Sequence, residues 1–222
     1  MIASCSNGEE ARMKELMAKL GASLIAGQTE EIKGFAEEAL RAGMSPHEII
    51  EQGMMPSMAE LGERFSQGEA YLPELLLAAH TMKAAMAILK GATSQQEMKP
   101  GATMLIGTVA GDVHDLGKNI VRMMFESAAF RVVDMGVNVS AEQFLEAYAR
   151  EKPALVGLSS LLTTTMGEMK NIVERLRAAY PEAKLIVGGA PIRQEFADQI
   201  GAHGYAPDAH TAVKVGKEIA GL

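Results

Sequence analysis

Cysteine, tryptophan and the other aromatic residues are scarce in this chain. Its 222 residues include one cysteine, no tryptophan and only 5% aromatic residues. The single cysteine, Cys5, excludes a disulfide within the chain and is typical of a protein of the reducing cytoplasm. No apolar run approaches the ~18 residues that a membrane span needs, and residues 1–10 lack the charged and then apolar order of a signal peptide. We therefore expect a cytoplasmic protein without a membrane partner.

Basic residues are too few for a protein that binds nucleic acid. Lysine and arginine total 21 against 28 aspartates and glutamates, for a formal net charge of -7, whereas a nucleic-acid partner usually requires a basic face. The 48% hydrophobic and 22% charged residues are typical of a globular protein with a sizeable core. The length allows one large domain or two small ones.

The N-terminal part of the chain shows helical periodicity and no strand pattern. The expected helices span residues 9–26, 29–41, 46–65 and 73–90. Thr29 is the expected N-cap of the second helix, and Ser45 caps the third with Glu48 as its capping-box partner. Gly53 and Pro56 are expected irregularities of that third helix. Four helices with short connections predict an antiparallel bundle.

The C-terminal part alternates between strand and helix patterns. The expected strands span 103–109, 130–135, 154–159, 184–188 and 203–206, and the expected helices span 117–128, 141–151, 166–180, 191–200 and 209–220. Five such units predict a five-stranded parallel sheet with helices on both faces, of flavodoxin or Rossmann type. The predicted domains are therefore a helical bundle over 1–91, a linker over 92–102 and an α/β domain over 103–222.

The most informative motif is the loop that follows the first expected strand. It reads Gly111-Asp112-Val113-His114-Asp115-Leu116-Gly117-Lys118-Asn119. The loop places His114 at the carboxyl end of a strand, where open α/β sheets bind their ligands. Asp112 is close enough to hydrogen-bond one ring nitrogen and leave the other free for a metal. Gly117 would let the backbone pass close to a bulky group.

Two further motifs lie at later strand ends. Ser159-Ser160-Leu161 ends the third expected strand, and Gly188-Gly189 ends the fourth. Taken singly, each has an ordinary alternative. Asp112 could be an acid near a helix N-cap, Ser159 and Thr165 could cap a helix, and the glycine pair could form a tight turn or a phosphate nest.

Taken together, the three motifs resemble the cobalamin-binding domain of methionine synthase, of corrinoid methyl-carrier proteins and of cobalamin mutases. The bundle segment Gly53–Leu89, with Phe65-Ser66-Gln67-Gly68-Glu69-Ala70-Tyr71-Leu72-Pro73-Glu74-Leu75, resembles the cap domain of methionine synthase and of methylotrophic corrinoid proteins. Mutases do not carry this cap directly before the cobalamin domain. The resemblance therefore favours methyl transfer over radical rearrangement.

The resemblance also implies a set of site residues around the cofactor, a cobalamin or related corrinoid that uses methylcobalamin and Co(I) forms. His114 matches the lower axial ligand of cobalt, Asp112 matches the carboxylate that orients the imidazole, and Thr165 lies where methionine synthase has a serine. The other residues that match the cofactor site belong to the ligand loop, the strand ends and the cap: Gly111, Val113, Asp115, Leu116, Gly117, Ser159, Leu161, Thr163, Gly188, Gly189, Ala209, Glu51, Phe65, Leu72 and Leu75.

Within this set, Ser159, Leu161 and Thr163 match the lining of the slot for the displaced base of the corrinoid. Gly188 and Gly189 match glycines that let the nucleotide tail lie against the backbone. The loop before Ala209 matches one that closes over that tail. In the bundle, Phe65, Leu72 and Leu75 match apolar side chains over the methyl face of the corrin, and Glu51 matches a capping carboxylate.

The implied function is methyl carriage by a subunit that is not itself catalytic. A substrate-specific methyltransferase loads the cobalt, a second methyltransferase passes the methyl group to a thiol or to tetrahydrofolate, and a reductive activase is a further implied partner. Two alternatives remain open at this point. One is a cobalamin-binding sensor or regulatory module, and the other is a receiver-like signalling domain without a corrinoid.

Overall fold

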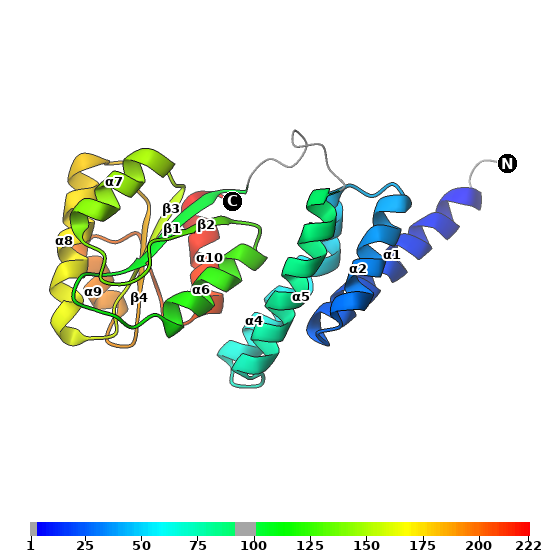
Figure 1. Cartoon of the computed structure of the whole chain (residues 1–222), viewed down its shortest axis with the longest axis horizontal. Coiled ribbons are helices and arrows are strands. Elements are labelled where there is room, and N and C mark those ends of the chain that lie inside the picture. Colours follow the sequence, from blue (N-terminus) through cyan, green and yellow to red (C-terminus); the bar gives the residue numbers. More distant parts are fainter. Residues whose placement is uncertain (1–3, 92–100) are drawn as a thin grey trace. The chain divides into compact units, whose positions relative to one another are not determined.

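The computed structural model describes residues 4–91 and 101–222, which belong to two compact units, Met1–Lys99 and Pro100–Leu222 (Figure 1). The first unit is helical and the second is an α/β fold. Apart from residues 101 and 102, the predicted linker over 92–102 lies outside the described residues. Each unit has a hydrophobic core of its own.

The helical unit is the predicted bundle. Its elements are α1 (Ser4–Ile25), α2 (Thr29–Arg41), α3 (Pro46–Glu48), the π-helical segment η1 (Ile49–Met54), α4 (Met55–Ser66) and α5 (Leu72–Gly91). Side chains from all the long helices fill its core, among them Leu16, Leu20, Leu24, Ile32, Ile49, Met54, Leu61, Leu75, Met82 and Leu89.

The start of the third predicted helix is confirmed, and its middle is irregular, as expected. The Ser45 hydroxyl oxygen accepts from the Glu48 N–H at 3.2 Å, and Glu48 Oε2 accepts from the Ser45 N–H at 2.8 Å. Pro56 lies in the first turn of α4, directly after η1, and has no N–H to continue the helical ladder. Gly53 is buried against α1, where an added Cβ would lie 2.9 Å from Met17 Sδ. A larger residue there would require the side chains of Met17 and Leu20 on α1 to move.

The predicted role of Thr29 is wrong. The N-cap of α2 is Gln28, which makes no side-chain capping bond. Thr29 is the first residue of the helix, and its Oγ1 lies 3.2 Å from Oγ1 of the buried Thr81 on α5. The hydroxyl therefore joins two helices. This distant partner is invisible in the local sequence.

Helix α5 corrects the expectation about apolar runs. Among the described residues, it is one helix that is long and apolar enough to cross a membrane, with a mean hydropathy of 1.3 over Leu72–Leu89. About two fifths of this window, 39%, is buried inside the structure, including Leu75, Met82 and Leu89. The core helix of a bundle has the same composition, because it is apolar on most of its faces.

The α/β unit contains the predicted parallel sheet. Its strands are β1 (Thr103–Thr108), β2 (Arg131–Asp134), β3 (Leu155–Ser159), β4 (Leu185–Gly188) and β5 (Gly204–Ala206), and each lies within its predicted range. All four neighbouring pairs are parallel, and the order in the sheet is β2-β1-β3-β4-β5. This is the flavodoxin-like order, whose ligand crevice opens between the carboxyl ends of β1 and β3.

Helices cover both faces of the sheet (Figure 1). One face is covered by α6 (Leu116–Ser127) and α10 (Ala209–Ala220). The other is covered by α7 (Ala141–Glu151), α8 (Met166–Ala179) and α9 (Gln194–Ile200), and the short 3₁₀ helix η2 (Thr163–Thr165) precedes α8. The close fit between these layers requires small residues. An added Cβ at Gly216 of α10, for example, would lie 2.6 Å from the Phe125 ring of α6.

Candidate functional site

The strand register aligns the ends of four strands. Thr108 of β1 pairs with Ser159 of β3, Ser159 pairs with Gly188 of β4, and Gly188 pairs with Ala206 of β5. The loops that follow these residues carry most of the predicted site residues. Motifs that are far apart in the sequence are therefore neighbours along the carboxyl edge of the sheet.

The loop after β1 presents a histidine to solvent and buries the adjacent carboxylate. Gly111 has a φ of +79°, and the Asp112 N–H donates back to the Val109 carbonyl at 3.2 Å. The Asp112 side chain is 0% exposed and the His114 side chain 47%. Nδ1 of His114 lies 2.7 Å from Asp112 Oδ1, which also accepts from the His114 N–H at 3.0 Å.

The second carboxylate oxygen of Asp112 binds the loop after β3. Oδ2 accepts from the N–H of Leu161 at 2.6 Å and of Leu162 at 3.3 Å, and from Thr165 Oγ1 at 3.3 Å. Burial opposes the charged form of Asp112. The N–H donors of His114, Leu161 and Leu162, together with the imidazole, outweigh this effect and lower the pKa of Asp112 from 3.8 to about 2. Asp112 is therefore ionised at neutral pH.

This charge decides which ring nitrogen of His114 is available. An ionised carboxylate can only accept hydrogen bonds, so Nδ1 must carry the hydrogen that lies between it and Asp112. In the neutral imidazole, Nε2 then carries the lone pair. The arrangement is the usual one for a histidine that ligates a metal through one nitrogen while a carboxylate holds the other.

A pair of hydroxyl groups lies behind the carboxylate. Thr165 Oγ1 and Ser160 Oγ are 2.7 Å apart and both residues are buried. Asp112, His114 and Thr165 thus come together as expected, and Ser160 joins them although it was not among the predicted site residues. Its position inside the motif Ser159-Ser160-Leu161 could have indicated a role in the site. Only the structure shows that the hydroxyl of the second serine, and not of the first, contacts Thr165.

The glycine pair Gly188-Gly189 at the end of β4 lies where a side chain would crowd the neighbouring backbone. Gly189 has a φ of +129°, and an added Cβ would lie 1.8 Å from the Ser160 carbonyl oxygen. At Gly188 an added Cβ would lie 3.1 Å from the Ala206 carbonyl oxygen. Ala209 is buried at the start of α10. These residues keep the backbone of three neighbouring loops closely packed.

Apolar side chains that face solvent surround His114. Val113 is 69% exposed, Leu116 67% and Leu161 44%. Leu162 and Val137 are also exposed on neighbouring loops, and an added Cβ at Gly117 would meet nothing within 4 Å. A group of exposed apolar residues often marks a binding surface. Here it lies beside the half-exposed imidazole of His114.

The remaining predicted residues of this unit are more peripheral. Thr163 is exposed at the start of η2, and Ser159 is half-buried at the end of β3, where its carbonyl accepts from the Val109 N–H at 3.0 Å. Asp115 is exposed and its Oδ2 accepts from Asn119 Nδ2 at 2.9 Å. The side chain of Asp115 is therefore bonded within its own helix turn.

The predicted residues of the bundle belong to the other unit. Phe65 and Leu72 are half-buried and flank the turn between α4 and α5, and Glu51 is exposed on η1. Leu75 is fully buried in the bundle core. Leu75 therefore supports the bundle from inside, whereas Phe65 and Leu72 contribute to its surface.

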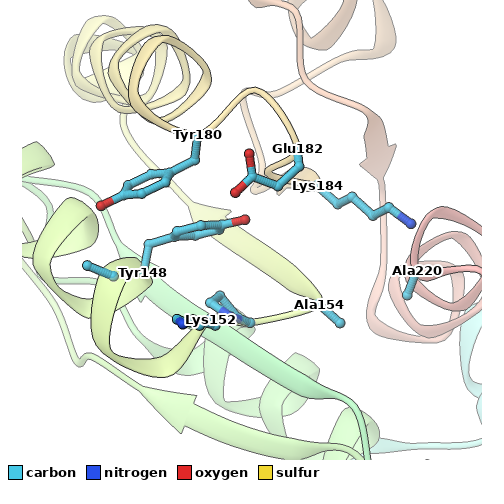
Figure 2. Close-up of a pocket in the computed structure, with 9 residues that line it drawn as sticks. Tyr148, Lys152, Ala154, Tyr180, Glu182, Lys184 and Ala220 are labelled. Carbon is cyan, nitrogen blue, oxygen red and sulfur yellow. The ribbon is translucent and has the colours of Figure 1, made fainter.

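A separate cavity of about 480 Å³ lies at the opposite edge of the sheet (Figure 2). Tyr148 and Tyr180 form one wall of it, with ring centroids 4.5 Å apart. Lys152, Glu182 and Lys184 bring charges of both signs to its lining. None of the predicted site residues lines this cavity, so the candidate site remains at the carboxyl edge.

Over the described ranges 4–91 and 101–222, no group of three or more His, Cys, Asp or Glu side chains could hold a metal ion. Among these residues, His114 therefore does not belong to a metal site built from three or more such side chains.

Comparisons with known proteins match both units. Residues 102–214 match a protein-family model described as a B12 binding domain. Residues 12–90 match a second family model with the same description. The two models together cover nearly all of the described chain.

Curated relatives match over almost their full length. Trimethylamine corrinoid protein 2 of Methanosarcina mazei is 41% identical over 204 residues, which is 90% of this chain and 94% of the relative. The dimethylamine corrinoid protein of Methanosarcina barkeri is 37% identical over 209 residues, or 93% of this chain and 98% of the relative.

Solved structures show the same architecture. A cobalamin-binding protein from Desulfitobacterium hafniense is 28% identical with a TM-score of 0.78, over 91% of this chain and 98% of that chain. The methanol:cobalamin methyltransferase complex MtaBC of Methanosarcina barkeri contains a chain that is 28% identical with a TM-score of 0.81, over 93% of this chain and 80% of that chain. This chain therefore belongs to the corrinoid, or B12-binding, proteins of methyltransferase systems, with a helical cap domain, an α/β B12-binding domain and a corrinoid as its cofactor.

Proposed function

We propose that this chain carries a methyl group on a bound corrinoid from a substrate-specific methyltransferase to a second methyltransferase. The observation that carries the proposal is the half-exposed imidazole of His114, which is held through Nδ1 by the buried Asp112 at the ligand crevice of a B12-binding domain. The second enzyme would pass the methyl group to a thiol or to tetrahydrofolate.

The residues at the crevice suit a corrinoid. A corrinoid would bring its own ligands to cobalt, so the single imidazole of His114 would be enough from the protein. The exposed Val113, Leu116 and Leu161 offer an apolar surface for the face of such a ring, and the space beside Gly117, where an added Cβ would meet nothing within 4 Å, leaves room for a bulky group. When bound, the cobalt accepts and releases the methyl group.

The chain's own residues hold and tune the axial ligand. Asp112 keeps the hydrogen of His114 on Nδ1. Its charge also makes Nε2 a stronger electron-pair donor to a metal. Thr165 Oγ1 lies 3.3 Å from the second oxygen of Asp112 and donates to it, and Ser160 Oγ lies behind it, 2.7 Å from Thr165 Oγ1. These groups set the position and basicity of one ligand.

The donor class follows from the relatives. Two of them are named for trimethylamine and dimethylamine, and we propose a methylamine as the source of the methyl group. A chain of this family is seen with a methanol:cobalamin methyltransferase in a solved complex, which supports a methyltransferase as the loading partner.

The test is transfer of an isotopically labelled methyl group. The protein is reconstituted with hydroxocobalamin, reduced, and mixed with labelled trimethylamine, dimethylamine or methanol, with and without the matching methyltransferase. We expect about one label per bound corrinoid with a methylamine and its methyltransferase, and none with the amine alone, because activating a poor leaving group requires positioned acid or electrophilic help. Multiple turnovers by this chain alone would show that it is an enzyme in its own right. Failure to bind hydroxocobalamin would overturn the proposal.

A further inference from the structure

Side chains from outside the ligand loop hold it at both ends. Thr108, the last residue of β1, donates from Oγ1 to the His114 carbonyl at 2.9 Å. Asn138, in the loop after β2, accepts at Oδ1 from the Gly111 N–H at 2.7 Å, and its own N–H donates to the Asp112 carbonyl at 2.9 Å. These three bonds bracket the segment from Gly111 to His114.

We propose that Asn138 and Thr108, here called the loop clamp, are positioning residues for the axial ligand. They hold the loop in the geometry in which Nε2 of His114 faces the corrinoid. The role in corrinoid binding rests on the proposed function. The restraint on the loop rests on the hydrogen bonds alone.

The backbone of Asn138 is itself held in place. Its φ is +54°, a left-handed conformation that asparagine tolerates better than most residues other than glycine. Beyond the end of β2, the Thr108 N–H donates to the Gly136 carbonyl at 3.0 Å, and the Val139 N–H donates to the Thr108 carbonyl at 2.9 Å. Pairing with β1 thus continues on both sides of Asn138. The amide oxygen is presented to Gly111 from a fixed position.

Thr108 completes the restraint on His114. The residue is fully buried, so its hydroxyl depends on a partner inside the protein. With the carbonyl of His114 held by Thr108 and its ring held by Asp112, both ends of the ligand residue are restrained. A ligand restrained before the metal binds loses less freedom on binding.

The experiment pairs each disruptive variant with a conservative one. Asn138→Gly keeps the positive φ and removes the amide oxygen, whereas Asn138→Asp keeps an acceptor oxygen. Thr108→Val removes the hydroxyl at nearly constant volume, and Thr108→Ser keeps it. The matched control is Ala129→Gly, because Ala129 has a φ of +63° but lies before β2, at the opposite end of that strand.

Two measurements are made on the full chain. In the protein without corrinoid, the reporter is hydrogen exchange at the His114 amide, which bonds to Asp112 and not to the loop clamp. We expect exchange to be about three- to tenfold faster in Asn138→Gly and Thr108→Val, as for the loss of one hydrogen bond. After reconstitution with hydroxocobalamin, the absorption spectrum gives the ratio of histidine-bound to histidine-free cobalt. We expect this ratio to fall about tenfold in the same two variants.

The conservative variants and the Ala129→Gly control should behave as the wild type in both measurements. Thermal unfolding shows whether each variant is folded at the temperature used. Two outcomes would overturn the loop clamp. One is wild-type exchange and a wild-type spectrum in Asn138→Gly and Thr108→Val. The other is exchange and spectra in Asn138→Asp and Thr108→Ser that are as altered as in the disruptive variants. If the wild type itself takes up no hydroxocobalamin, the proposed function fails, and the exchange measurement still decides the loop clamp.

Discussion

At the scale of single residues, the site depends on the contrast between Asp112 and His114. The carboxylate is fully buried and accepts hydrogen bonds from two loops, whereas the imidazole is half-exposed. A buried charge is tolerated only when such bonds replace its hydration. Asp112 is therefore held firmly in place, and its Oδ1 fixes the orientation of the His114 ring.

Removing either member of this pair should change the cobalt ligand in a graded way. We expect His114→Ala, reconstituted with hydroxocobalamin, to lose the spectrum of histidine-bound cobalt altogether. Asp112→Asn should keep His114 but lower the affinity of Nε2 for cobalt by about 10- to 100-fold, since the carboxylate charge is lost. Absorption titrations measure both effects. Unaltered coordination in His114→Ala would rule out this residue as the ligand.

Gly189 should not tolerate even one methyl group. Its φ of +129° and the 1.8 Å approach of an added Cβ to the Ser160 carbonyl mean that the backbone must move. We expect Gly189→Ala to lower the free energy of unfolding by about 2 kcal/mol or more and to weaken corrinoid binding. Gly136→Ala is the control, because Gly136 also has a positive φ but an added Cβ meets nothing within 4 Å. Urea unfolding of both variants gives the comparison, and equal losses would argue against the clash.

At the scale of elements, an ion pair fastens α6 to the end of β2. Lys118 has a side chain that is almost fully buried, and its Nζ donates to both oxygens of Asp134 at 2.7 and 2.8 Å. Asp134 Oδ1 also accepts from the Gly136 N–H at 2.9 Å. The helix that follows the ligand loop is thereby tied to the loop that carries Asn138.

This ion pair predicts a loss of stability in acid. Burial raises the pKa of Asp134, but the bonds from Lys118 and Gly136 outweigh it, and the pKa lies below its usual value of 3.8. The folded state therefore binds fewer protons than the unfolded state. The stabilisation is complete above about pH 4 to 5 and is lost as the pH falls through the lowered pKa.

We expect the urea midpoints of wild type and Asp134→Asn to differ clearly at pH 7 and to converge as the pH falls below 4. Other carboxylates with lowered pKa values, Asp112 among them, lower the stability of both proteins in acid. Only the difference between the two proteins reports on Asp134. A difference that stays constant from pH 7 to pH 3 would contradict the assignment of the pair.

At the scale of the whole molecule, the α/β unit carries the ligand loop, the loop clamp and the glycine pair within one core. That core joins Leu105, Phe144, Val156, Ile172 and Leu185 from strands and helices of residues 101–222. A unit with its own core can usually fold alone.

We expect residues 101–222 alone to fold cooperatively and to bind hydroxocobalamin with the spectrum of histidine-bound cobalt. If the bundle covers the methyl face of the corrin, as the cap resemblance implies, photolysis of bound methylcobalamin should be faster in this fragment than in the full chain. Circular dichroism and absorption spectroscopy check the two parts. A fragment that is folded but binds no corrinoid would mean that residues outside 101–222 are essential for corrinoid binding.

The sequence by itself determined the features that depend on neighbours along the chain. Periodicity predicted the bundle and the five strands, the Ser45–Glu48 pair predicted a helix start, and the Asp112–His114 spacing predicted a carboxylate beside an imidazole. Each is a local effect, in which the partners lie within about one turn of helix or a few residues of loop.

Only the tertiary structure decided which distant groups meet. Asp112 accepts from Leu161, 49 positions away, and Gly111 donates to Asn138, 27 positions away. Thr29 bonds to Thr81 instead of capping its helix. Such partners depend on strand order and register, because parallel strands align residues that the sequence separates by a helix. The sequence therefore predicted the chemistry of the ligand loop, whereas the packing of the sheet determined which residues hold the loop in place.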